Sequence, residues 1–149
     1  MIAVDTNVLV HAHQREASLH GRANEVLRRL AESPTPWAIC WHCLVEFYGV
    51  VTHPKIWKQP TTPHAAINQI AAWRESPSLR LICDSHGTLD TLSALAVAGE
   101  VRGALIHDAR IAASCLTAGI TELWTVDRDF SRFPALKIRN PLVTSEERN

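Results

Sequence analysis

Hydrophobic positions along the chain follow two spacings, and each predicts a different kind of element. Short apolar runs rich in branched and aromatic residues predict buried strands, at residues 2–4, 37–40, 79–83, 123–126 and 136–138. Apolar residues three and four positions apart predict helices, beginning near residue 8 and spanning 19–32, 44–51, 63–75, the stretch from 84 to about 101, and 105–117, with a turn or short helix at 127–133 and a frayed tail at 146–149. This alternation predicts an α/β fold, in which a short parallel sheet of about four to five strands has helices on both faces.

Polar residues and proline mark the helix boundaries. Thr6 or Asn7 can cap the first helix, because either side chain can accept a hydrogen bond from a free backbone N–H. Thr62 followed by Pro63 is typical of a helix start. In the long helix after residue 83, four residues are expected to face inward: Leu89, Leu92, Leu95 and Ala96.

Length and charge limit the possible classes of protein. The chain has 149 residues, the size of one domain, and no internal repeat or linker divides it, so residues 1–149 are expected to form a single domain. Fifteen basic and fifteen acidic residues give zero net charge. That balance argues against strong nonspecific nucleic-acid binding, which needs many Lys and Arg contacts to phosphate. An enzyme whose metal ion supplies local positive charge remains possible.

The chain shows no signal for a membrane or for secretion. No stretch approaches 18 apolar residues, and Asp5 interrupts the N-terminal apolar run, unlike in a signal peptide. We therefore expect a cytoplasmic protein whose four cysteines are reduced thiols. Cys40 and Cys43 have a C-x-x-C spacing that suits redox or zinc chemistry, but no second pair accompanies them, so buried structural thiols are the preferred interpretation.

Two acids directly follow predicted strands. Asp5 ends the first strand and Asp127 ends the strand at 123–126. In open α/β sheets, ligands bind at the carboxyl ends of the strands. Asp129 stands two residues after Asp127. One of this pair should point into the cleft while the other caps the turn, and we favour Asp127 because it directly ends the strand.

Two further acids occupy apolar helices. Asp108 shares a helix face with Leu105 and Ala112, although a first-turn acid that interacts favourably with the helix dipole is an equal alternative. Glu46 lies within the apolar helix 44–51. It either belongs to a functional cluster, pairs with an arginine, or lies on a narrow polar strip, and the residues alone leave these interpretations open.

Carboxylates that converge in one cleft repel one another, and a hard cation relieves this repulsion. Oxygen ligands suit Mg²⁺ or Mn²⁺ better than zinc. We therefore expect Asp5, Glu46, Asp108 and Asp127 to hold Mg²⁺ or Mn²⁺ and to be catalytic. The chemistry that this cluster implies is phosphodiester hydrolysis by a metal-activated water.

Four segments carry a resemblance to a known family, and they appear in the family's order. They are the N-terminal Val4–Leu9, the helical Glu46, the segment His107–Ala113 and the segment Trp124–Phe130. Together they resemble the PIN-domain ribonucleases, and within them the VapC toxins of bacterial toxin–antitoxin pairs. The resemblance covers essentially the whole chain and implies a PIN-like three-layer sandwich. It also implies an Mg²⁺- or Mn²⁺-dependent endonuclease that acts on RNA, forms a homodimer and is inhibited by a cognate antitoxin.

The resemblance extends to individual positions. Asp5, Glu46, Asp108 and Asp127 match the family's acidic positions, and Thr125 matches its accessory hydroxyl. Substrate contacts are expected from four residues: Thr6, Asn7, Arg110 and Thr125. Solvated arginine is the alternative interpretation for Arg110. Asp84 departs from the family pattern, and we expect it to cap the helix that follows.

Two other functions compete with the nuclease. A catalytically inactive PIN-like module that binds RNA or acts as a scaffold would keep the fold, but all four acids are present. A phosphatase of the haloacid-dehalogenase type also begins with a strand and an Asp. That class needs a second Asp two residues later, where this chain has Asn7, so the phosphatase ranks low.

Overall fold

Five parallel strands form the centre of the computed structural model, which describes residues 1–143. In chain order they are β1 (Ile2–Val4), β2 (Trp37–Cys40), β3 (Leu79–Ile82), β4 (Glu122–Trp124) and β5 (Lys137–Arg139). In space their order is β3-β2-β1-β4-β5, and every neighbouring pair is parallel. The predicted parallel sheet is confirmed, with β1 at its centre. The expected tail at 146–149 lies outside the described residues.

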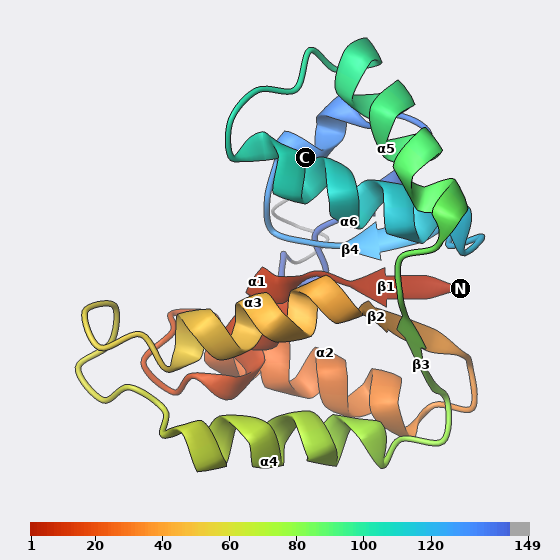
Figure 1. Ribbon diagram of the computed structural model, residues 1–149. Helices are drawn as coiled ribbons and strands as arrows, with labels where there is room; N and C mark the ends of the chain where they lie inside the picture. Colours follow the sequence, from red (N-terminus) through yellow and green to blue (C-terminus); the bar gives the residue numbers. More distant parts are fainter. Residues whose placement is uncertain (144–149) are drawn as a thin grey trace.

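Helices cover both faces of this sheet. They are α1 (Thr6–His13), α2 (His20–Glu32), α3 (Trp41–Val51), α4 (Pro63–Arg74), α5 (His86–Ala98) and α6 (Leu105–Thr117), with the short 3-10 helix η1 (Asp129–Arg132). Figure 1 shows α5 and α6 on one side of the strands and α1 to α4 on the other. This three-layer arrangement follows from right-handed crossovers, because the chain moves from β1 toward β3 in one direction and then returns to β4 and β5. None of the helices within residues 1–143 has the length and apolar character to cross a membrane.

The start of α1 corrects one prediction. Asp5, not Thr6 or Asn7, is the residue that caps this helix. Its backbone is extended, and its carboxylate accepts a hydrogen bond from the Thr6 backbone N–H at 2.7 Å. The cap at α4 is as predicted, since the Thr62 hydroxyl accepts from the Ala65 N–H and Pro63 is the first helical residue. Asp5 therefore ends a strand and starts a helix at once.

Helix α5 departs from the prediction in three ways. It ends at Ala98 rather than near residue 101. Its cap is Ser85, which forms a reciprocal capping box with Thr88, so the expectation that Asp84 caps this helix is wrong. Leu89 was expected to face inward but its relative exposure is 66%. The reason is that α5 is an outer helix that packs mainly against α6, so a single narrow face is covered.

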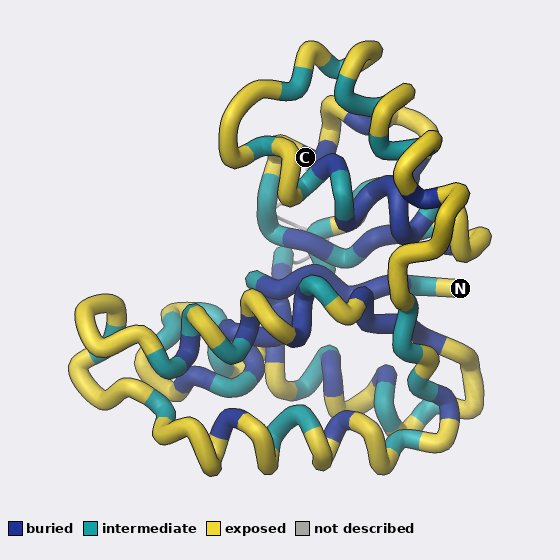
Figure 2. The backbone as a smooth tube through the Cα atoms, viewed as in Figure 1, coloured by how far each residue is buried: buried dark blue, intermediate teal, exposed yellow. Residues whose placement is uncertain are grey.

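The core lies between the sheet and the helices that pack on it, and Figure 2 shows the buried residues concentrated there. Trp37 of β2 and Phe47 of α3 are fully buried on this core. In α6, Ala109 and Ala112 are also fully buried, and their small side chains let the helix approach the sheet closely. Helix α6 spans Leu105–Thr117, the predicted range. This helix places Asp108 near the carboxyl ends of the strands.

All four cysteines are free. Cys40 and Cys43 are buried, as the interpretation of structural thiols required, while Cys83 is exposed. The Cys40 sulfur lies 3.7 Å from the Cys115 sulfur, which comes from α6. The C-x-x-C spacing therefore serves packing between β2, α3 and α6.

Candidate active site

A cavity of about 280 Å³ opens at the carboxyl ends of β1 and β4. Strands β2 and β3 follow on one side of β1, and β4 and β5 lie on its other side. Where the strand order reverses in this way, the connections leave the sheet on opposite faces and a crevice forms between them. Ten residues line the cavity: Asp5, Thr6, Asn7, Val10, His11, Glu46, Val50, Trp57, Asp108 and Asp127. All four predicted acids are among them.

Asp5 is the most deeply placed of these acids, with 3% relative exposure. One carboxylate oxygen accepts from the Thr6 N–H, and the other accepts from the Asn7 side-chain amide and the Thr125 hydroxyl, each at 2.7 Å. Asn7 also accepts from the Val126 N–H at 3.2 Å. These bonds join the end of β1 to the end of β4 and hold the carboxylate in one orientation.

Burial raises the pKa of Asp5 to about 7, from an ordinary value of 3.8. The hydrogen bonds from Thr125 and Thr6 oppose this rise because they stabilise the ionised form, and the charges of Glu46 and Asp108 add to it. Burial is thus the main cause, and repulsion by the neighbouring carboxylates is a smaller one.

Glu46 lies at the rim of the cavity. It is exposed, unlike its buried neighbours Phe47 and Leu44 on the other side of α3. Its carboxylate accepts a hydrogen bond from the Thr6 hydroxyl at 2.6 Å. No salt bridge among the described residues joins Glu46 to an arginine, so that interpretation is excluded. The hydrogen bond from Thr6 instead connects Glu46 to the first residue of α1.

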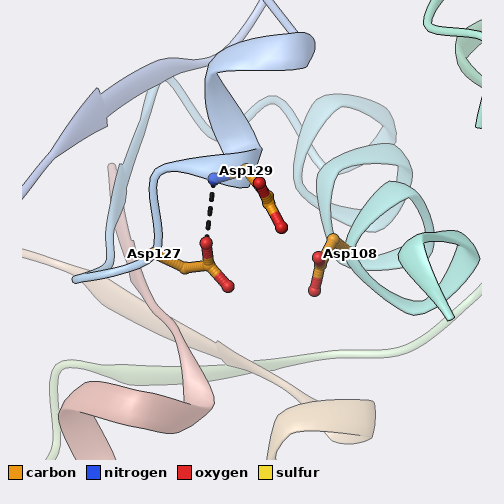
Figure 3. Close-up of side chains that lie close together, drawn as sticks. All are labelled: Asp108, Asp127 and Asp129. Atoms are coloured by element: carbon orange, nitrogen blue, oxygen red, sulfur yellow. Dashed lines mark hydrogen bonds between the residues drawn. The ribbon is translucent and has the colours of Figure 1, made fainter.

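Three aspartates form the opposite wall. One carboxylate oxygen from each of Asp108, Asp127 and Asp129 lies within 4.8 Å of the other two. Figure 3 shows Asp108 projecting from α6 toward the two aspartates of the segment after β4. Asp127 accepts from the Asp129 N–H at 2.8 Å, so its side chain stabilises the turn that leads into η1, whose N-cap is Arg128, while Asp127 also lines the cavity. The prediction that the two functions would be divided between Asp127 and Asp129 is wrong.

The pKa of Asp108 is also raised, to about 6. Desolvation is the first cause, and the charges of Asp127, Glu46 and Asp129 follow. When a cation binds among several neighbouring carboxylates, it stabilises their ionised forms and offsets their mutual repulsion. The electrostatics of the cavity therefore favour binding of a positive charge.

Comparison with known proteins decides the family. The sequence model of the PIN-domain family matches residues 2–136 of the chain. The chain is 31% identical to Ribonuclease VapC48 of Mycobacterium tuberculosis over 137 residues, which cover 92% of this chain and 94% of that protein. It is 32% identical to VapC ribonuclease Mb2897 of Mycobacterium bovis over 142 residues, which cover 95% and 96%. The chain belongs to the VapC ribonucleases of the PIN-domain family.

Solved structures agree on the fold. The sarcin-ricin loop cleaving toxin VapC20 of Mycobacterium tuberculosis superposes with a TM-score of 0.66 at 24% identity, over 88% of this chain and 93% of that one. The VapBC2 structure from Rickettsia felis, bound to a promoter DNA fragment, gives a TM-score of 0.68 at 21% identity, over 93% and 98%. At these identities the likeness extends to the fold alone, which is the VapC arrangement predicted from the sequence.

In this VapC ribonuclease, the residues expected to contact substrate mostly face the acids. The Thr125 side chain is buried, with 1% relative exposure, and donates to Asp5. Asn7 donates to Asp5, and Thr6 to Glu46. These three residues therefore position the carboxylates, and the structure does not support a direct substrate contact for Thr125.

Arg110, the fourth expected substrate contact, belongs to a separate network. Its guanidinium lies 2.6 Å from Asp84 in an ion pair, and its Nη1 lies 3.1 Å from His42 Nδ1. The Ser114 hydroxyl donates to Asp84 at 2.6 Å. Burial, the largest single effect, raises the pKa of Asp84, but the hydrogen bonds from Ser114 and Arg110 and the charge of Arg110 together hold this pKa below its usual value.

Sequence reasoning gave His42 no function. The His42 ring stacks on His107 with ring centroids 5.5 Å apart and planes within 9° of parallel. The sequence did carry one signal for His42. It stands four residues before Glu46, and residues four apart share a helix face. The aromatic and apolar wall of the cavity was also missed, and its Trp57 indole donates to the Val50 carbonyl oxygen at 2.9 Å.

Proposed function

We propose that this chain is a metal-dependent endoribonuclease and the toxin of a type II toxin–antitoxin pair. The single observation that supports this most directly is the convergence of carboxylates from four separate segments in one cavity. Its relatives are ribonucleases by name, and the acids that match the family motif are the ones that meet. Hydrolysis of a phosphodiester bond in RNA is the reaction that fits this cluster.

The donor atoms of the cavity fit a divalent cation. Asp5, Glu46, Asp108 and Asp127 offer carboxylate oxygens, which are the ligands preferred by Mg²⁺ and Mn²⁺. Asp129 supplies a further oxygen within the same group. When bound, such an ion lowers the pKa of water and stabilises negative charge that develops on phosphate.

The chain's own residues define how the acids are presented. Thr125 and Asn7 hold Asp5, Thr6 holds Glu46, and the Asp129 backbone holds Asp127. The carboxylates are therefore oriented before any ligand arrives, which avoids the cost of ordering them during the reaction. Because these groups repel phosphate, we expect RNA to bind modestly and only when the cation is present.

The test is cleavage of RNA by purified protein with Mg²⁺, with Mn²⁺ and with EDTA. Asp108→Asn keeps the size of the side chain and removes one ligand charge, so cleavage should fall by roughly 100-fold or more. Asp90→Asn is the matched control, because Asp90 is an exposed aspartate on α5, outside the cavity. Equal activity of Asp108→Asn and wild type would refute the site.

The same experiment decides between an enzyme and an inactive PIN-like module. The alternative predicts RNA binding without cleavage under any metal condition. Cleavage that requires a divalent cation and disappears in Asp108→Asn but not in Asp90→Asn excludes the inactive module.

The partners follow from the relatives and from the surface. Toxin–antitoxin complexes are among the similar solved structures, one of them from Klebsiella pneumoniae, and we propose that a cognate antitoxin binds this chain in the cytoplasm, where RNA is available. An Arg or Lys of the antitoxin that reaches the acids would replace the cation's charge. Exposed apolar side chains on the outer helix α5, Leu89 and Val97, support association with protein, including a homodimer.

Co-expression tests the antitoxin directly. The small protein encoded beside this chain should copurify with it and relieve growth inhibition. Failure of both would remove the toxin role while leaving the nuclease intact, and size-exclusion chromatography of the purified chain would test the homodimer.

A further inference from the structure

A second groove, of about 320 Å³, lies beside the acidic cavity along the same edge of the sheet. Its lining consists of Trp41, His42, Cys83, Asp84 and Arg110. These residues come from the start of α3, the segment directly after β3, and α6. Because β2 and β3 end here while β1 and β4 end at the acids, the two hollows are neighbours on the carboxyl edge of one parallel sheet.

Two pairs of residues join this groove to the acids. His42 precedes Glu46 by four positions on α3, which is about 6 Å along a helix axis. His107 immediately precedes Asp108 on α6. The His42 imidazole, which lines the groove, stacks on that of His107, so the groove is in contact with the residue next to Asp108.

The polar groups of the groove are held in place before anything binds. Arg110 Nε donates to Asp84 at 2.8 Å, its Nη2 lies 2.6 Å from the same oxygen, and its Nη1 lies 3.1 Å from His42. Asp84 also accepts from Ser114, which has 2% relative exposure. An ion pair as exposed as this one contributes little to stability, so stability alone does not explain a network with four members.

The charge of the groove indicates the kind of group it accepts. Arginine has only donors, so His42 Nδ1 must accept from Arg110 and the imidazole is neutral. The charges of Arg110 and Asp84 cancel each other. The groove therefore lacks the excess positive charge that a phosphate site needs, and instead offers flat faces and hydrogen-bonding edges. Trp41, a residue with 55% relative exposure, adds an indole ring.

We propose that this groove binds an unpaired base of the RNA substrate beside the scissile phosphate, with Trp41 as the stacking surface and the Arg110–Asp84 pair as its polar edge. The proposal rests on the nuclease function proposed above. Single-stranded RNA is recognised in this way, by bases that stack on aromatic rings or guanidinium planes and form hydrogen bonds at their edges. As part of this polar edge, Arg110 contacts substrate, and it also positions His42 through its Nη1 donor.

The experiment compares short single-stranded RNAs that differ only by an abasic residue at successive positions around one cleavage site. Loss of one stacked base costs about a factor of ten or more. Trp41→Ala should therefore lower kcat/KM on the intact RNA by about tenfold or more, and Trp41→Phe should restore most of it. On the RNA that lacks the bound base, wild type and Trp41→Ala should cleave equally slowly, because the contact is already absent.

Val45→Ala is the matched control. Val45 is an exposed residue on the same helix, and Trp41 and Val45 both line a neighbouring apolar groove. Equal loss in Val45→Ala and Trp41→Ala would indicate that the apolar groove, not the base site, is responsible. That result overturns the proposal. The proposal also fails if Trp41→Ala lowers kcat/KM by the same factor on every abasic RNA, or if Trp41→Ala does not lower kcat/KM at all.

Binding separates failure of the base site from failure of the nuclease. With Ca²⁺ present and Asp108→Asn as the background, fluorescence anisotropy of a labelled RNA reports affinity without cleavage. The base site requires that Trp41→Ala and the matching abasic RNA each weaken binding by about tenfold, and not additively. If wild type cleaves no RNA but binding shows this pattern, the nuclease function fails and the base site stands. If cleavage is normal but binding ignores Trp41, the base site fails alone.

Discussion

Replacement of Asp5 by Asn should change how the stability of the metal-free protein depends on pH. In the folded protein, burial raises the pKa of Asp5 to about 7, whereas its ordinary value is 3.8. A carboxyl group with a raised pKa in the folded state contributes stability that is fully present below the unfolded pKa. That stability is lost as the pH rises through the folded pKa. Wild type should therefore become less stable between about pH 4 and pH 7.

The magnitude follows from these two pKa values. A pKa difference from 3.8 to about 7, at about 1.36 kcal/mol per pH unit, corresponds to roughly 4 kcal/mol over the full range. Between pH 5 and pH 8 the part that Asp5 contributes is roughly 2–3 kcal/mol, because much of the titration falls between these values. Asn does not titrate, so this part of the pH dependence should vanish in Asp5→Asn.

Lost hydrogen bonds act in the opposite direction. The Asp5 carboxylate accepts from Thr6, Asn7 and Thr125, and an amide has a single acceptor oxygen. The substitution therefore costs about 1–2 kcal/mol at every pH. Wild type has already lost roughly 2 kcal/mol at pH 5, so we expect Asp5→Asn to be about as stable as wild type at pH 5 and roughly 2–3 kcal/mol more stable at pH 8.

Urea unfolding in EDTA at pH 5 and pH 8 measures this, with Asp90→Asn as a control for the loss of a carboxylate elsewhere. The free-energy difference between Asp5→Asn and wild type should shift by roughly 2–3 kcal/mol between the two pH values. A constant difference at both pH values would refute a buried carboxyl with a raised pKa. With Mg²⁺ added at pH 8, wild type should regain stability, because ligand binding favours the folded state.

Three further predictions concern other parts of the site and core. Thr6→Val should lower cleavage about tenfold without unfolding the protein, since it removes one hydrogen bond to Glu46; circular dichroism and kinetics check both, and an unchanged rate would contradict the positioning role. Asp127→Asn should lower metal-dependent cleavage more than Asp129→Asn does, because Asp127 lines the cavity; the reverse order in a cleavage assay would reassign the fourth acid. Phe47→Ala should cost about 3–5 kcal/mol in a denaturation experiment, because it empties a fully buried position; a cost below about 1 kcal/mol would contradict that packing.

Local patterns allowed most of the fold to be predicted. The strand at 37–40 and the helix Leu105–Thr117 match the structure to the residue, because apolar periodicity and Gly119 at the end of the helix are signals within one segment. The placement of Asp5 and Asp127 at strand ends also follows from the chain itself. Such inferences succeed when the physical cause lies within a few residues.

Side-chain partners far apart in sequence could not be predicted. Asp84 was expected to serve as a local cap, but its partners Arg110 and Ser114 lie 26 and 30 residues away. Leu89 satisfies the helical pattern equally well whether or not another element covers it, and only the outer position of α5 leaves it exposed. Thr125 was matched to a hydroxyl position by resemblance, yet its contact with Asp5 depends on the pairing of β1 with β4.

The position of β1 determines when the acidic cavity can form during synthesis. Strand β1 precedes the other four strands of the sheet in the chain, yet it lies in the middle of the sheet, between β2 and a strand that begins at Glu122. A growing chain that stops before residue 122 has one bare edge on β1 and lacks both Thr125 and Asp127. Long-range strand pairing of this kind is slow because distant parts of the chain must meet. The acidic cavity can therefore assemble only after Thr125 and Asp127 have been made, so a shorter nascent chain lacks the complete set of carboxylates.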